Sequence, residues 1–186
     1  MVTMNRLPYD SPAMKELILG GARSGKSAMA EQRAAASGLD VVYIATAQPG
    51  DEEMARRIAR HRRDRPGHWT VVEEPLYLAA VLSQHGSERR CVLVDCLTLW
   101  VSNLLHHPQA SLLEQQREAL LACLGDLPST VIFVSNEVGM GVVPMGEVSR
   151  RFCDETGRLH QALARRCERV TLMVAGLPLT VKGEES

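Results

Sequence analysis

Residues 20–27 constrain the fold of this chain more than any other stretch. They read GGARSGKS, with the spacing G-x-x-x-x-G-K-[ST] from Gly20 to Ser27. A short apolar run, residues 17–19, comes directly before them, and residues 28–36 are rich in the helix formers Ala, Met, Glu and Gln. A strand, a glycine-rich turn and a helix in this order form the context in which such a pattern binds phosphate groups.

Each residue type in the turn has a chemical reason. Glycines let the backbone curl so that its N–H groups converge on an anion. Lys26 would contact the β- and γ-phosphates, and the Ser27 hydroxyl would bind Mg²⁺. The positive end of the following helix would face the same phosphates. An ordinary glycine-rich strand-to-helix turn is the alternative, but it leaves the Lys26-Ser27 pair unexplained.

The bulk properties of the chain favour one α/β domain. Its 186 residues suffice for one hydrophobic core, and a hydrophobic content of 45% is typical of globular proteins. A net charge of −1 gives no indication of a nucleic-acid partner, and no apolar run is long enough to span a membrane. We expect a flexible tail over residues 1–13 and one domain over residues 14–186.

The cysteines indicate a reducing environment. Their number is odd, no C-x-x-C pair occurs, and no histidine lies at metal-binding spacing from them. Reduced thiols in a cytoplasmic protein are the expectation, each a small buried hydrophobe. The cysteines are Cys91, Cys96, Cys123, Cys153 and Cys167.

Apolar runs alternate with helical patterns along the rest of the chain. Short continuous apolar runs are typical of strands buried on both faces of a parallel sheet. The sequence therefore predicts a three-layer α/β fold of the P-loop NTPase type, RecA-like, with a mainly parallel sheet. Strands are expected at 17–19, 41–45, 68–73, 91–95, 131–135 and 170–174, with an antiparallel edge strand at 179–181. Helices are expected at 28–36, 51–63, 76–84, 97–105, 112–124 and 148–166.

Polar residues that follow these strands are candidate ligand contacts, because ligands of open α/β sheets bind beyond the carboxyl ends of the strands. Thr46 and Gln48 follow one strand, and Glu73 lies near the end of another. Asp95 ends an apolar run in the Walker-B pattern, whose carboxylate holds Mg²⁺ directly or through water. A strand-end aspartate that caps the next helix is the alternative. Residues 136–139 read NEVG and not N-K-x-D, which argues against a Ras-like switch.

His61 lies in an arginine-rich segment that is predicted to be helical. Helical spacing places it on one face with Met54, Ile58 and Arg65. From the residues alone, a histidine at the core edge below a solvated basic face is favoured. The second interpretation is a nucleophilic or acid–base histidine beside a phosphate site, where the positive neighbours favour a neutral imidazole.

Motif blocks in a fixed order resemble the bifunctional adenosylcobinamide kinase/adenosylcobinamide-phosphate guanylyltransferase family of cobalamin synthesis. The likeness runs from about residue 14 to residue 182. The blocks are GGARSGKS, YIATAQ, DEEMARRIARHRRDRPGHW, VLVDCLTLWVSNLL and VSNEVGMGVVP. The resemblance implies phosphorylation of the aminopropanol hydroxyl of adenosylcobinamide by ATP or GTP. It also implies transfer of GMP from GTP onto the new phosphate, which yields adenosylcobinamide-GDP and pyrophosphate.

The same resemblance implies roles for individual residues. The family's guanylyl transfer passes through a GMP-histidine, and its histidine matches His61, so His61 becomes the favoured nucleophile, with Lys26 as the second catalytic residue. Ser27 and Asp95 keep the Mg²⁺ roles that their patterns predict, and the 136–141 block is expected to shape the corrinoid or phosphate end. The family implies a homo-oligomer, a trimer, with sites near subunit interfaces. The nucleotide-site residues implied are Gly20, Gly21, Ala22, Arg23, Ser24, Gly25, Lys26, Ser27, Thr46, Ala47, Gln48, Arg62, Arg63, Asp64, Arg65, Glu73 and Asp95.

Two other kinds of protein remain as alternatives. A P-loop small-molecule kinase without a covalent histidine would lose little when His61 is replaced. A RecA-like nucleic-acid ATPase would use the arginine-rich helix and show salt-sensitive binding. The near-neutral charge and the lack of stacking aromatics beside the arginines argue against the second. A non-catalytic nucleotide sensor is disfavoured by the complete Lys26, Ser27 and Asp95 set.

Overall fold

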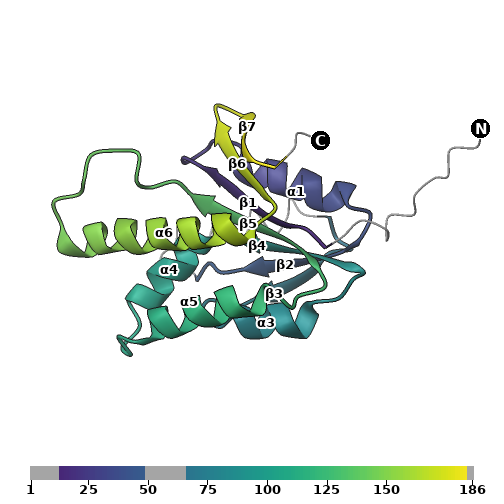
Figure 1. The fold of residues 1–186 in the computed structure, drawn as a ribbon, viewed down its shortest axis with the longest axis horizontal. Coiled ribbons are helices and arrows are strands. Elements are labelled where there is room, and N and C mark those ends of the chain that lie inside the picture. Colours follow the sequence, from purple (N-terminus) through teal and green to yellow (C-terminus); the bar gives the residue numbers. More distant parts are fainter. Residues whose placement is uncertain (1–12, 49–65, 184–186) are drawn as a thin grey trace, which may run out of the picture.

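The computed structural model describes residues 13–48 and 66–183. Within these residues a seven-stranded sheet has the order β3-β2-β4-β5-β1-β6-β7 (Figure 1). The strands are β1 (Lys15–Gly20), β2 (Asp40–Ala45), β3 (Thr70–Glu73), β4 (Arg90–Asp95), β5 (Thr130–Asn136), β6 (Arg169–Val174) and β7 (Leu177–Lys182). The helices are α1 (Lys26–Ala36), α3 (Leu78–His85), α4 (Leu97–Leu105), α5 (Leu112–Cys123) and α6 (Glu147–Arg166).

The sheet is parallel except at one edge. Strands β3, β2, β4, β5, β1 and β6 pair in parallel, and β7 pairs with β6 in antiparallel register. A two-residue turn joins β6 to β7, with Ala175 at φ 52 and Gly176 at φ 83, the left-handed conformation that tight hairpins use. The predicted parallel sheet and antiparallel edge are confirmed, although the edge strand begins at Leu177, earlier than expected.

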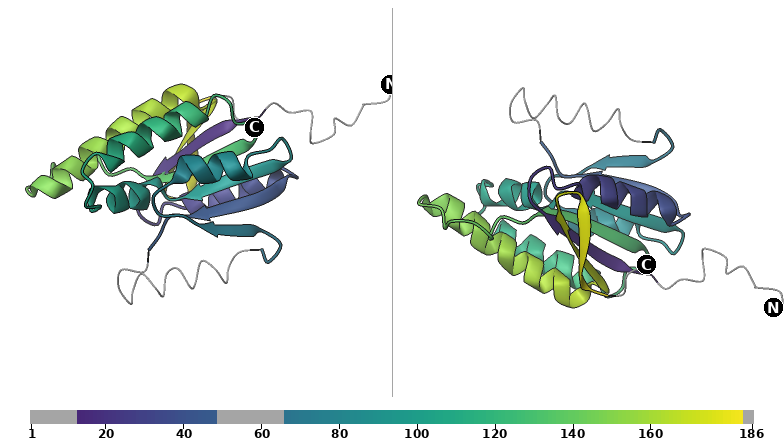
Figure 2. Two further views of the ribbon diagram at one scale, coloured as in Figure 1. Left: turned by 90° about the horizontal axis from the view of Figure 1, so that it is seen from below. Right: turned by 90° about the horizontal axis from the view of Figure 1, so that it is seen from above.

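The sheet separates two hydrophobic cores. One face packs against α3, α4, α5 and α6, with Trp100 and Phe133 among its largest fully buried side chains. The other face packs against α1 through Ala30 and Ala34, with Tyr43 in the same core. Figure 2 shows the sheet between these helices from two opposite sides. This three-layer arrangement places the start of α1 directly beyond the end of β1.

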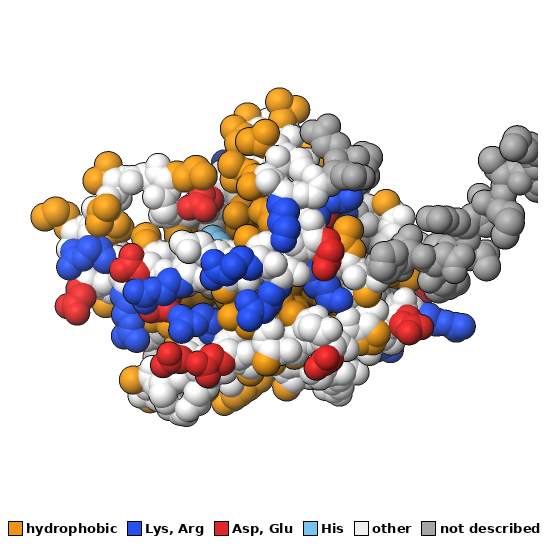
Figure 3. All heavy atoms as spheres, viewed as in Figure 1, with side chains coloured by type: hydrophobic (Ala, Val, Ile, Leu, Met, Phe, Trp, Pro, Cys, Tyr) orange, Lys and Arg blue, Asp and Glu red, His pale blue; other side chains and the backbone are white. Residues whose placement is uncertain are grey.

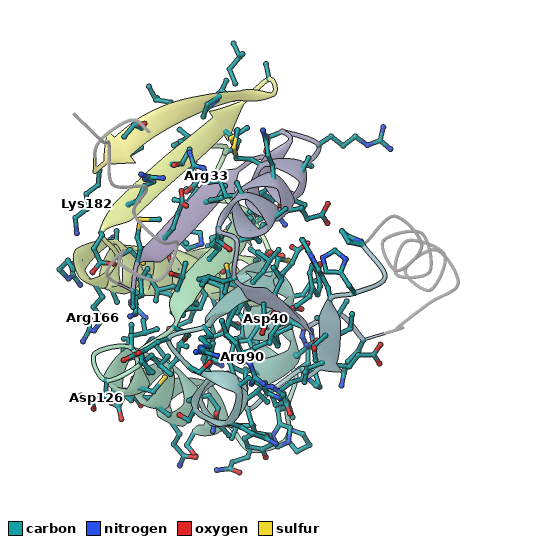
Figure 4. All side chains as sticks on the ribbon, turned by 90° about the vertical axis from the view of Figure 1, so that its right-hand side faces the viewer. Arg33, Asp40, Arg90, Asp126, Arg166 and Lys182 are labelled. Carbon is teal, nitrogen blue, oxygen red and sulfur yellow. The ribbon has the colours of Figure 1, made fainter. Side chains whose placement is uncertain are left out.

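A buried ion pair fastens α1 to β1. Glu16 of β1 is fully buried and pairs with Arg33 of α1, which lies between the helix and the sheet (Figure 4). The Thr171 hydroxyl donates to Glu16 Oε1 at 3.2 Å, and Arg33 Nη1 donates to Thr171 Oγ1 at 3.1 Å. Burial lowers the pKa of Arg33, and the nearby Arg169 charge lowers it further. The pair holds the two elements that flank residues 20–27.

Several sequence predictions have a definite outcome. The elements expected in the described residues are present, with bounds shifted by only a few positions. The five cysteines are free thiols, and Cys91, Cys96 and Cys167 are buried as expected, whereas Cys123 and Cys153 are only partly buried. Among the described residues, no helix has the length and apolar character needed to cross a membrane. The helix predicted at 51–63 and residues 1–12 of the predicted tail lie outside the described residues.

Candidate active site

The loop between β1 and α1 is shaped by its glycines. A Cβ at Gly20 would lie 2.4 Å from Ser24 Oγ and 2.8 Å from the Met173 carbonyl oxygen, so no side chain fits there. Gly25 has φ 91, a left-handed conformation that side chains disfavour. The Ser24 N–H donates to Gly21 O at 3.3 Å, which closes the turn. These contacts produce the compact curl that the motif predicts.

Lys26 lies at the start of α1 with its ammonium directed back over the loop. Nζ donates to the Gly21 carbonyl at 3.0 Å, and the side chain is largely buried. The first N–H groups of α1 have no partner within the helix, and the helix dipole makes this end positive. Lys26, the loop backbone and the helix end therefore concentrate positive potential at one point, which suits a polyphosphate.

The β6–β7 hairpin supports this loop from the side. The Gly176 N–H donates to Ser24 O at 3.0 Å, and a Cβ at Gly25 would meet Gly176 Cα at 3.4 Å. The hairpin is far from the loop in sequence, so a motif search cannot detect the contact. The glycine that follows the last parallel strand is the one sequence signal that points to it.

Asp95 ends β4, and β5 lies between β4 and β1. The register pairs Gly20 with Asn136 and Asp95 with Val134, so Asp95 and the loop lie about 10 Å apart across two strand spacings. The buried Tyr43 hydroxyl donates to Asp95 Oδ2 at 2.8 Å and fixes the carboxylate. A carboxylate oxygen and the Ser27 hydroxyl are hard donors, which Mg²⁺ prefers when phosphate oxygens and water complete its shell. The donor set fits that ion.

Thr46 is fully buried, and its hydroxyl, its N–H and its carbonyl all form hydrogen bonds. Its hydroxyl donates to Cys96 O at 2.7 Å and accepts from Cys96 N at 2.9 Å. Its own N–H donates to Asp95 O at 3.2 Å, and its carbonyl accepts from Asn103 Nδ2 at 2.8 Å. Thr46 thus ties the end of β2 to the segment that carries Asp95. Its side chain holds the backbone of Cys96, and its N–H holds that of Asp95. A nucleotide contact by Thr46 stays a prediction.

The end of β5 carries polar residues with contacts that the sequence did not predict. The sequence indicated only that the 136–141 block belongs to the corrinoid or phosphate end. Asn136 Nδ2 donates to Thr98 Oγ1 at 3.0 Å, and the Thr98 hydroxyl lies 3.1 Å from Cys96 Sγ. The Glu137 N–H donates to Gly20 O at 3.0 Å. The end of β5 therefore bridges the phosphate loop and the Asp95 segment. A polar Ser-Asn-Glu ending on an apolar strand is the sequence signal for this bridge.

The structure brings together only part of the predicted set. Residues 20–27, residues 46–48 and Asp95 lie along one edge of the sheet. Ala47 is half-buried and Gln48 is exposed. Glu73 is exposed at the end of β3, four strand spacings or about 20 Å from β1, so it does not adjoin the phosphate loop. The predicted His61, Arg62, Arg63, Asp64 and Arg65 lie outside the described residues.

Comparisons with known proteins agree over most of the chain. The model of the family described as "Cobinamide kinase / cobinamide phosphate guanyltransferase" matches residues 16–181. The bifunctional adenosylcobalamin biosynthesis protein CobP of Pseudomonas aeruginosa is 64% identical over 171 residues, covering 92% of this chain and 99% of that protein. The bifunctional adenosylcobalamin biosynthesis protein CobU of Escherichia coli is 37% identical over 182 residues, covering 91% and 100%.

Solved structures of ATPases share the fold. One ATPase domain aligns with a TM-score of 0.50 at 18% sequence identity, over 86% of this chain and 69% of that one. A prototypical ATPase from the type III secretion system of pathogenic bacteria aligns with a TM-score of 0.52 at 11% identity, over 91% and 57%. These likenesses concern the fold alone. Together with the sheet order, they confirm the predicted P-loop NTPase-type fold with a RecA-like arrangement of strands.

Proposed function

Since the chain belongs to the cobinamide kinase / cobinamide phosphate guanylyltransferase family, we propose that one phosphate loop, residues 20–27, serves both reactions of that family. The chain is a bifunctional enzyme of adenosylcobalamin biosynthesis. It phosphorylates adenosylcobinamide and then joins GMP to the phosphate. The observation that carries the proposal is the clustering of Lys26, the α1 N-terminus and Asp95 at one sheet edge.

The kinase step transfers the γ-phosphoryl group of ATP or GTP. The substrate hydroxyl forms a new P–O bond while the bond from the γ-phosphorus to the β-phosphate oxygen breaks, and the hydroxyl proton is released. Lys26 and the loop N–H groups would stabilise the charge on the leaving diphosphate. Ser27 and Asp95 would hold Mg²⁺, which neutralises phosphate charge when bound. Tyr43 and Thr46 keep Asp95 in place for that task.

The guanylyl step uses His61 as the nucleophile in this proposal. A neutral imidazole nitrogen attacks the α-phosphate of GTP, an N–P bond forms, and pyrophosphate leaves. A phosphate oxygen of adenosylcobinamide phosphate then attacks the same phosphorus, the N–P bond breaks, and adenosylcobinamide-GDP is released. The support for His61 is its place in the sequence. It belongs to residues 49–65, which connect Gln48, beyond the carboxyl end of β2, to Pro66 before β3.

The remaining nucleotide contacts are proposed around that connection. Arg62, Arg63 and Arg65, with Asp64 among them, would contact the phosphates that leave or react at the α-position. Glu73 pairs in register with Ala45, so it lies nearer to residues 46–48 than to the phosphate loop. We therefore assign Gln48 and Glu73 to the far end of the nucleotide and residues 20–27 to its phosphates.

The corrinoid end is proposed to lie at the loop between β5 and α6. This loop starts at Glu137, beside the root of the phosphate loop, and exposes Met140, Val142, Val143 and Met145. Figure 3 shows apolar side chains gathered on this loop and on the β6–β7 hairpin. An apolar surface that begins at the phosphate site suits a large macrocycle whose hydroxyl must reach the γ-phosphate.

Self-association into a trimer is also proposed. The hairpin exposes Val174, Leu177, Leu179 and Val181, and β7 is one of the two edge strands of the sheet. Exposed apolar side chains on an edge strand favour contact with another chain. Sedimentation equilibrium should give three times the chain mass, whereas a monomer at micromolar concentration would contradict the trimer.

The free thiols support a cytoplasmic location.

Radiolabelled GTP tests the function directly. The enzyme is incubated with Mg²⁺ and GTP labelled at the α- or the γ-phosphate, then denatured and washed. We expect acid-labile, alkali-stable label from α-labelled GTP only. His61→Ala should abolish it, and the control variant His106→Ala, an exposed histidine at the end of α4, should retain it. Corrinoid phosphorylation without protein label would instead indicate a kinase that lacks a covalent histidine.

A further inference from the structure

His160 is a buried histidine outside the phosphate loop and the Asp95 segment. It lies on the buried stripe of α6 with Thr156, Leu159 and Leu163, and its exposed fraction is 7%. Its Nε2 lies 2.7 Å from the hydroxyl of Ser135, which is fully buried near the end of β5. A polar ring on an apolar stripe is unfavourable unless it is hydrogen-bonded, so the Ser135 contact is what makes the position tolerable.

The other ring nitrogen faces a carboxylate. Nδ1 lies 3.8 Å from Glu137 Oε2. Burial lowers the pKa of His160, and the Glu137 charge opposes that shift. In the neutral ring, the carboxylate favours the proton on Nδ1, so Nε2 accepts the Ser135 hydroxyl proton. Ser135, His160 and Glu137 form one polar cluster, with a hydrogen bond on one side of the imidazole and a carboxylate facing the other.

The Ser135–His160–Glu137 cluster does not have the accessibility of a hydrolytic centre. A nucleophilic serine must meet a substrate, whereas Ser135 has no exposed surface. Thr156 and Leu159, also buried, lie on the same stripe of α6. The Ser135–His160 end of the cluster is therefore closed to substrates, and its effect must be exerted through the backbone that it holds.

That backbone lies between the two halves of the nucleotide site. Ser135 and Glu137 flank Asn136, so the imidazole contacts both neighbours of this residue. Asn136 reaches the Asp95 side through Thr98, and the Glu137 N–H donates to Gly20 O at the root of the phosphate loop. Glu137 Oε1 also accepts from the Gly139 N–H at 2.7 Å and shapes the start of the β5–α6 loop.

We propose that His160 is a positioning residue for phosphoryl transfer, which fixes residues 135–139 between the phosphate loop and the Asp95 segment. It contacts neither nucleotide nor corrinoid. Its loss should leave nucleotide binding largely intact, because the loop glycines and Lys26 keep their own contacts. Turnover should fall, because transfer depends on alignment of the two halves. This inference rests on the proposed kinase step.

Three substitutions of His160 separate positioning from packing. In His160→Gln the side-chain amide lies near the position of Nε2 and preserves the bond to Ser135. In His160→Asn the amide lies near Nδ1 and loses that bond. His160→Leu keeps the volume and removes both nitrogens. His106→Gln, at an exposed histidine, is the matched control. Corrinoid phosphorylation is measured for each, with kcat and the KM for GTP, alongside thermal unfolding.

We expect kcat to fall at least tenfold in His160→Leu and His160→Asn, with the KM for GTP within threefold of wild type. His160→Gln should recover most of the kcat, and His106→Gln should match wild type. Full kcat in a folded His160→Leu protein would overturn the proposal, because packing alone would then suffice. A kcat that follows melting temperature across all three variants would overturn it as well.

Amide hydrogen exchange separates this inference from the function itself. If wild type and His106→Gln phosphorylate no corrinoid, the proposed function fails, and exchange still tests the positioning claim. Peptides that cover residues 136–146 should exchange faster in His160→Leu than in His160→Gln, under conditions where both are folded. Equal exchange in the two variants would overturn the role given to His160.

Discussion

The phosphate loop and the end of β5 lie side by side, yet they are built in opposite ways. The loop is one run of consecutive residues, and its shape follows from glycines at 20 and 25 and from the contacts among residues 20–29. The end of β5 is held by partners 25 and 38 residues away, His160 of α6 and Thr98 of α4. Local chemistry defines the first region, and tertiary packing defines the second.

This difference shows that the phosphate loop depends on contacts with distant residues as well as on its own sequence. The loop can curl by itself, but its two ends are fixed from outside, by Glu137 at Gly20 and by the hairpin residue Gly176 at Ser24. The Glu16–Arg33 pair holds the flanking strand and helix together in addition. Substitutions that displace the loop backbone should therefore abolish the site outright, whereas mutations at the end of β5 should loosen it.

The largest effect is expected from Gly20→Ala in comparison with Gly21→Ala. A Cβ at position 20 overlaps Ser24 Oγ and the Met173 carbonyl, while a Cβ at position 21 meets nothing within 4 Å. Overpacking of this kind costs about 1–3 kcal/mol of unfolding free energy and should displace the loop. Urea unfolding and GTP binding measure both effects. Equal stability of the two variants would contradict the loop geometry described above.

A smaller effect is expected when the support of Asp95 is removed. Tyr43→Phe deletes the 2.8 Å hydrogen bond to Asp95 Oδ2, and bonds to charged groups contribute about 1.5–3 kcal/mol. We expect the Mg²⁺ concentration for half-maximal kinase activity to rise by up to about tenfold. Tyr77→Phe, at an exposed tyrosine, is the control and should change nothing. An unchanged Mg²⁺ requirement in Tyr43→Phe would show that Tyr43 does not position Asp95 for the metal.

The smallest effect concerns pH and His160. Its pKa is lowered in the folded protein by burial, with Glu137 opposing, from an ordinary value of 6.5. Below about pH 6.5 the unfolded chain binds a proton that the folded imidazole resists, so the stability of wild type falls as the pH drops. Relative to His160→Gln, wild type should lose less than about 1.4 kcal/mol of unfolding free energy for each pH unit that the pH falls. Urea unfolding of both proteins at several pH values measures this difference. Parallel curves of unfolding free energy against pH for wild type and His160→Gln would contradict the prediction.

Most of the fold could be predicted because the central strands of the sheet are parallel and buried on both faces. Runs such as 131–135 and 91–95 are continuously apolar, and each forms a strand. The phosphate loop was equally predictable, since its residues are contiguous. Tyr43 and His160 were not identified, because a polar atom in an apolar stripe gives no sequence signal until its partner is known. Thr46 looked like an open ligand contact, whereas its side chain is buried against Cys96.

Lys26→Ala provides the most direct test of whether one loop serves both reactions. The variant is assayed in parallel for corrinoid phosphorylation and for protein label from α-labelled GTP, beside His61→Ala. We predict that Lys26→Ala loses both signals together, each by about 10²–10³-fold as for other charge-stabilising groups, while His61→Ala loses only the label. A Lys26→Ala protein that still becomes labelled at the wild-type rate while phosphorylating no corrinoid would contradict the shared site.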